Sequence, residues 1–131
     1  MTKNTQYWLD LSDYDLQTAE AMLLSGRYLY VGFMCHQTIE KALKAYYSYI
    51  HNEIPPFSHS LSFLAKKAGI YEEFTEGQKD FIDQLEPLNI EARYPSYKER
   101  LLKSLTHEKC EGLLSGTKNI QGWIKTKLLA N

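Results

Sequence analysis

The sequence predicts an all-α protein, an antiparallel up-down four-helix bundle with an additional short helix. Three observations support this fold class. Apolar or small side chains recur at steps of three and four residues along several long segments, as in amphipathic helices. No segment of useful length alternates apolar and polar residues, as a half-buried strand would. Four Pro and seven Gly are few for an all-β fold with many turns.

The first two helices are long and have clear ends. The first is expected over about residues 5–25, because Gly26 follows it as a natural stop. The second is expected over about residues 28–51, since Pro55-Pro56 cannot continue a helix. Their core-facing stripes are Leu9, Ser12, Leu16, Ala19 and Leu23, and His36, Ile39, Leu43, Tyr46 and Ile50. A second stripe on the second helix is polar and consists of Gln37, Glu40, Lys41 and Lys44. This stripe and the glycines of the last helix are the two candidate dimer surfaces.

Capping residues mark the next two helices. Ser58 or Ser60 caps a short helix expected over about residues 60–68. Thr75, followed three residues later by Gln78, fits a capping box that opens the fourth helix. The apolar face of the fourth helix is then Phe81, Leu85, Leu88 and Ala92.

Prolines interrupt the fourth segment before the last helix begins. Pro87 is expected to kink or end the helix near Glu86. Arg93-Tyr94-Pro95 then closes the segment, because a residue before proline avoids the helical region. The last helix is expected from about Thr106 to Leu129. Three glycines weaken it or allow a close helix contact: Gly112, Gly116 and Gly122.

Length and composition indicate a single soluble domain, residues 1–131. The 15 basic and 16 acidic side chains give a net charge of -1, which argues against binding nucleic acid through overall charge but leaves room for a local basic patch. The polar start of the chain lacks the apolar region of a signal peptide, and no apolar run approaches the roughly 18 residues of a membrane span. We therefore expect a cytoplasmic protein with no membrane contact and with Cys35 and Cys110 as reduced thiols.

Charge is distributed unevenly along the second half of the chain. Residues 72–92 hold one basic and seven acidic side chains, whereas residues 93–109 hold five basic and two acidic ones. Tyr94 and Tyr97 lie among the basic residues, and this combination suits phosphate contact and base stacking. The alternative interpretation is a solvated surface with no ligand.

Motifs for a metal, a cofactor or a covalent intermediate are missing. None of the four histidines has Glu three residues before it, no glycine-rich phosphate loop occurs, and no Ser or Cys lies in a nucleophile motif. We expect no metal and no cofactor. His36 is interpreted as a core histidine, and Glu40 with Lys44 as a structural ion pair.

Arg100 and His107 are seven residues apart, so they would share a face if the segment were one continuous helix. On such a face the arginine could hold a phosphate group while the histidine transfers a proton in metal-free RNA cleavage.

Several stretches resemble the HEPN domain, the higher eukaryotes and prokaryotes nucleotide-binding domain. The stretches are Trp8 with Asp15-Leu16 and Ala19, Gly26-Arg27-Tyr28, CHQTIEKALKA over residues 35–45, HSLSFL over 59–64, EARYP over 91–95, and Ile120, Trp123 and Ile124 in the last helix. The resemblance covers nearly the whole chain. It implies a four-helix bundle with an extra short helix, commonly a homodimer, often encoded beside a minimal nucleotidyltransferase, sometimes as the toxin of a toxin-antitoxin pair.

The resemblance also implies two functions. Active family members are metal-independent ribonucleases with R-x4–6-H, whereas others bind nucleotides. Arg93 lies where the family's arginine is expected, but Lys98 and not histidine follows five residues later. The sequence therefore predicts a binding and interaction module that contacts nucleotide or RNA phosphate through Arg93, Tyr94, Lys98 and Arg100. The alternatives are a ribonuclease toxin, in which Arg100 or Arg93 holds the phosphate and His107 transfers the proton, and a purely structural partner.

Overall fold

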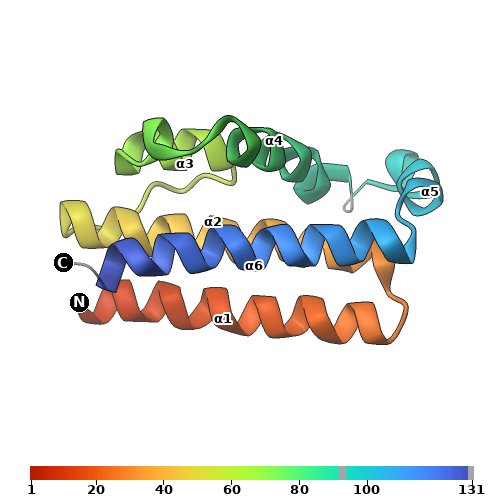
Figure 1. The fold of residues 1–131 in the computed structure, drawn as a ribbon, viewed down its shortest axis with the longest axis horizontal. Helices are drawn as coiled ribbons and strands as arrows, with labels where there is room; N and C mark the ends of the chain where they lie inside the picture. Colours follow the sequence, from red (N-terminus) through yellow and green to blue (C-terminus); the bar gives the residue numbers. More distant parts are fainter. Residues whose placement is uncertain (92–93, 130–131) are drawn as a thin grey trace.

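In the part of the chain that the structure describes, the long helices α1, α2 and α6 lie side by side, the shorter α3 and α4 cover one face, and α5 projects at one end (Figure 1). The computed structural model describes residues 1–91 and 94–129. The elements are α1 (Lys3–Leu24), α2 (Tyr28–His51), α3 (Leu61–Ala68), the 3-10 turn η1 (Tyr71–Glu73), α4 (Glu76–Glu91), α5 (Pro95–Ser104) and α6 (His107–Leu129). Helices α1 and α4 run in one direction, and α2 and α6 run in the other. The predicted all-α up-down bundle is confirmed.

Side-chain caps fix the helix starts that the sequence predicted. The hydroxyl of Ser60 accepts a hydrogen bond from the Phe63 amide at 3.3 Å, so Ser60 is the cap of α3. Thr75 and Gln78 form a reciprocal capping box at the start of α4. The Gln78 amide donates to the Thr75 hydroxyl at 3.1 Å, and the Thr75 amide donates to the Gln78 side chain at 2.9 Å.

Helix α2 is the centre of the bundle and contacts α1, α3, α4 and α6. Its predicted stripe is buried at His36, Ile39, Leu43 and Tyr46, whereas Ile50 is exposed near the helix end. The polar stripe is not a dimer surface, because Gln37, Glu40 and Lys44 are buried by the surrounding helices. Their polar groups are paired inside the bundle instead of being left in an apolar core. Lys41, at the edge of this stripe, binds Asp15 of α1 at 2.5 Å.

One alternative predicted for Pro87, that it ends the fourth helix, is wrong, whereas Tyr94 lies outside any helix, as expected for the residue before Pro95. Pro87 does not end α4, which continues to Glu91, because the turn beyond Pro87 is held by packing. Leu88 and Asn89 are buried there, and Asn89 accepts a hydrogen bond from Gln37 at 3.0 Å. Pro95 begins the unpredicted helix α5, since proline needs no amide partner at a first helical position and has a suitable φ. The predicted face residue Ala92 lies outside the described residues.

A close helix contact exists at one of the three glycines of α6. A Cβ atom at Gly116 would overlap the ring of Phe81 on α4, whereas Gly112 and Gly122 face open space. Gly116 therefore leaves room for the Phe81 ring of α4, and the other two glycines are not needed for packing.

Replacing Gly116 with alanine is expected to destabilise the protein, whereas Gly112→Ala is expected to stabilise it. Overpacking against Phe81 costs about 1–3 kcal/mol, which exceeds the gain of up to about 1 kcal/mol in helix preference. Urea unfolding of both variants tests this difference. An equal gain in stability at the two positions would show that Phe81 does not need the space over Gly116.

Candidate nucleic-acid interface

One end of the bundle gathers the α1–α2 turn, the starts of α2 and α6, and α5 (Figure 1). We name it the α5 end. Tyr28 is the first residue of α2 and His107 the first of α6, and their ring centroids are 5.7 Å apart. Two helices begin at this end, and α1 and α4 finish at it, so positive and negative ends of helix dipoles lie together here.

The α1–α2 turn places Arg27 and Tyr28 at this end. Gly26 has a φ of +74°, which favours glycine, and its amide donates to the Leu23 carbonyl at 3.2 Å. The Arg27 amide donates to the Met22 carbonyl at 2.8 Å. These two bonds make a Schellman motif, so α1 stops and the chain reverses within three residues.

The chain also breaks between α5 and α6. Leu105 is buried, and the Thr106 hydroxyl accepts a hydrogen bond from the Lys109 amide at 3.2 Å, which caps α6. Arg100 and His107 therefore lie on different helices. The argument that they share a face required one continuous helix, and it does not apply to this fold.

The predicted binding residues lie on or before α5. Tyr94 precedes α5 and is 55% exposed, and Arg100 is exposed within this helix. Lys98 also belongs to α5, but its side chain lies outside the described part of the structure. Arg93 lies outside the described residues altogether.

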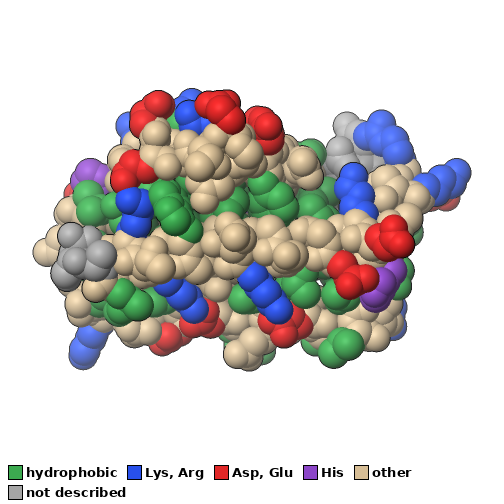
Figure 2. Space-filling view, viewed as in Figure 1, with side chains coloured by type: hydrophobic (Ala, Val, Ile, Leu, Met, Phe, Trp, Pro, Cys, Tyr) green, Lys and Arg blue, Asp and Glu red, His purple; other side chains and the backbone are tan. Residues whose placement is uncertain are grey.

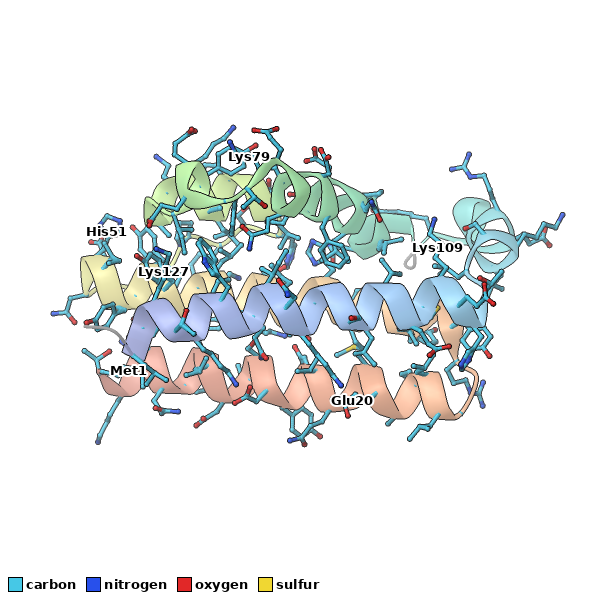
Figure 3. All side chains as sticks on the ribbon, viewed as in Figure 1. Met1, Glu20, His51, Lys79, Lys109 and Lys127 are labelled. Carbon is cyan, nitrogen blue, oxygen red and sulfur yellow. The ribbon has the colours of Figure 1, made fainter. Side chains whose placement is uncertain are left out.

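Basic side chains gather at the α5 end (Figure 2). Lys109 lies here, whereas the labelled His51 and Lys127 lie at the opposite end (Figure 3). Among the side chains that the structure describes, the exposed basic residues at this end are Arg27, Arg100, Lys103 and Lys109. Acidic residues are also exposed here: Glu99, Glu108 and Glu111. The surface is therefore mixed, with its excess of positive charge on α5.

His107 uses both ring nitrogens. Its Nε2 lies 3.0 Å from Oε1 of Glu111, and its Nδ1 lies 3.1 Å from the hydroxyl of Tyr28. When the ring is neutral, Nε2–H donates to the carboxylate and Nδ1 accepts from the Tyr28 hydroxyl. This arrangement orients the rings of His107 and Tyr28 and leaves neither histidine nitrogen directed at a substrate.

Sequence reasoning did not assign a role here to Arg27, Tyr28 or Glu111. Glu111 follows His107 by four residues, which is the spacing of a helical pair and a usable signal. Tyr28 and His107 are 79 residues apart, so no sequence spacing indicates their contact.

Several other kinds of site find no support in the described parts of the chain. Residues 1–91 and 94–129 contain no cluster of three or more His, Cys, Asp or Glu able to hold a metal ion. None of the described helices has the length and apolar character to cross a membrane. Cys35 and Cys110 are free and buried, and burial raises the pKa of Cys35 to about 12 and that of Cys110 to about 11. Neither thiol is activated as a nucleophile.

The fold defines a small all-α up-down bundle with a short extra helix, and α5 adds exposed basic side chains at one end. The chain belongs to the HEPN domain family, whose HEPN domain model matches residues 5–127. The family resemblance inferred from the sequence is confirmed.

Two solved structures share the fold. TT1696 from Thermus thermophilus is 21% identical with a TM-score of 0.82, over 96% of this chain and 99% of that chain. ST0689, an archaeal HEPN homologue, is also 21% identical with a TM-score of 0.68, over 96% of this chain and 98% of that chain. No curated protein sequence matches the chain. At this identity the two structures establish the fold alone.

Proposed function

We propose that this protein is a nucleotide- or RNA-binding module that holds phosphate groups with a basic arm, defined as residues 93–109. The residues expected to contact the ligand are Arg93, Tyr94, Lys98 and Arg100. The observation that carries the proposal is that α5 stands out from the end of the bundle with Arg100 and Lys103 exposed on it.

Charge and family membership support this assignment. The basic arm holds five basic and two acidic side chains, although the whole chain has a net charge of -1. Lysine and arginine displace counterions from a nucleic-acid backbone, which is the main source of affinity that does not depend on base sequence.

Replacing Arg93 and Arg100 together with glutamine is expected to weaken binding of a labelled single-stranded RNA. For each phosphate contact that is lost, about 0.7 counterion stays on the RNA instead of being released on binding. This lowers the affinity about fivefold at about 0.1 M salt, or about 25-fold for the two contacts. The slope of log affinity against log salt is expected to fall by about 1.4. Fluorescence anisotropy over a salt series measures both quantities.

The matched control is Lys66→Gln with Lys67→Gln, which removes the same charge from the exposed side chains of α3 at the far end of the bundle. This variant is expected to bind RNA with nearly the original affinity and salt slope. Equal losses in the two double variants would mean that total charge, and not the basic arm, governs binding. Unchanged affinity in the Arg93 and Arg100 variant would remove the basic arm from the proposed function.

We propose a homodimer and a minimal nucleotidyltransferase partner, as in a toxin-antitoxin pair, on the basis of family membership. Neither proposal uses the buried polar stripe of α2, because Glu40 and Lys44 are covered within one chain.

A further inference from the structure

A pocket of about 240 Å³ lies beside the basic arm, at the α5 end. It is lined by Gly26, Arg27, Tyr28, Leu29, Tyr30 and Leu102, which come from the α1–α2 turn, the first turn of α2, and α5. Pockets for drug-sized ligands begin at about 300 Å³, so this volume suits a smaller group such as one planar ring system.

The walls of this pocket combine aromatic, apolar and cationic groups. Tyr30 is 45% exposed and Leu102 is 47% exposed, which leaves their apolar surfaces accessible to a ligand. Arg27 is exposed and its side chain does not cap α2. Tyrosine rings are stacking platforms for any base, and an arginine beside them contacts either the base face or its phosphate.

Tyr28 is held in place before any ligand arrives. Its hydroxyl is bonded to His107, whose other ring nitrogen is paired with Glu111. A side chain that is already fixed loses less conformational entropy when a ligand packs on it. The Tyr28–His107–Glu111 chain therefore prepares one wall of the pocket.

We propose that this pocket takes the base of a nucleotide or of single-stranded RNA, whose phosphates lie on the basic arm. In this arrangement His107 is a positioning residue that acts through Tyr28. The inference rests on the proposed function, because it adds a base subsite to a phosphate site.

The test compares a labelled oligouridylate with a strand of the same length that lacks bases. Tyr30→Ala and Leu102→Ala, both at accessible positions, are expected to weaken binding of oligouridylate by about tenfold or more for a lost stacked base. Binding of the abasic strand is expected to stay unchanged. Tyr14→Ala, on the exposed face of α1, is the matched tyrosine control and is expected to bind both strands normally.

The positioning role of His107 has its own readout. His107→Ala and Tyr28→Phe each remove the bond between the two side chains, so they are expected to weaken oligouridylate binding by similar factors. The double variant is expected to bind oligouridylate about as weakly as either single variant, because both substitutions remove the same bond. Loss of abasic-strand binding in either variant would show damage to the fold, and multiplicative losses would overturn the positioning role.

The outcomes separate this inference from the proposed function. If Tyr30→Ala and Leu102→Ala bind oligouridylate normally while the Arg93 and Arg100 variant binds both strands weakly, the base subsite is wrong and phosphate binding stands. If the arginine variant also binds normally, both proposals fall. Weaker binding of oligouridylate alone in the pocket variants supports the base subsite.

Discussion

Replacing Glu40 with leucine is expected to lower the free energy of unfolding by about 3–5 kcal/mol, the usual effect of removing one partner of a buried ion pair. Glu40 is 2% exposed and its Oε2 lies 3.1 Å from the ammonium of Lys44, which is also buried. The other carboxylate oxygen lies 2.9 Å from Nδ1 of His59. Without Glu40, the charge of Lys44 stays inside the bundle with no carboxylate to balance it.

The contact with His59 adds a second reason for a large effect. His59 belongs to the loop between α2 and α3, so its bond to Glu40 ties that loop to the middle of α2. Without Glu40, the buried charge of Lys44 would keep a weaker cation–π interaction, since its ammonium lies 5.2 Å from the centroid of the Trp8 ring. The substitution therefore affects a charge and a loop together.

Urea unfolding of a double-mutant cycle measures the effect of Glu40. Adding Lys44→Met to Glu40→Leu is expected to recover much of the lost stability, because an apolar pair of similar volume replaces the buried ions. The exposed pair of Glu20 and Lys118, 3.4 Å apart, supplies the control, and Glu20→Leu is expected to change stability by less than about 1 kcal/mol. A similar small loss for Glu40→Leu would mean that water reaches Lys44.

The sequence predicted helix limits well where glycine, proline and caps mark them. The expected range of the second helix, 28–51, is the range of α2, because Gly26 and Pro55-Pro56 bound it. Helix α5 was missed because Pro95 was interpreted as a stop. The same residue fits the first position of a helix, and a single sequence does not distinguish these two uses.

The partners of the site residues depend on tertiary structure. Spacing placed Arg100 and His107 on one face, but a buried Leu105 and a capping Thr106 divide the segment into two helices. Helical periodicity also treated Glu40 as a surface residue. Other parts of the chain cover α2 on several sides, so Glu40 is buried although its position in the helical pattern predicted exposure. Its carboxylate tolerates burial because it pairs with Lys44 and with His59, which is distant in the sequence.

Leu43→Ala is expected to lower the free energy of unfolding by about 2–5 kcal/mol, because Leu43 is fully buried in α2 and its loss leaves a cavity. Ile50 is the matched control, since it continues the same stripe by sequence but is 47% exposed. Ile50→Ala is expected to change stability by about 0.5 kcal/mol or less, because alanine's better helix preference offsets the lost contacts. Urea unfolding measures both variants. Equal small losses would mean that α2 does not direct Leu43 into the core.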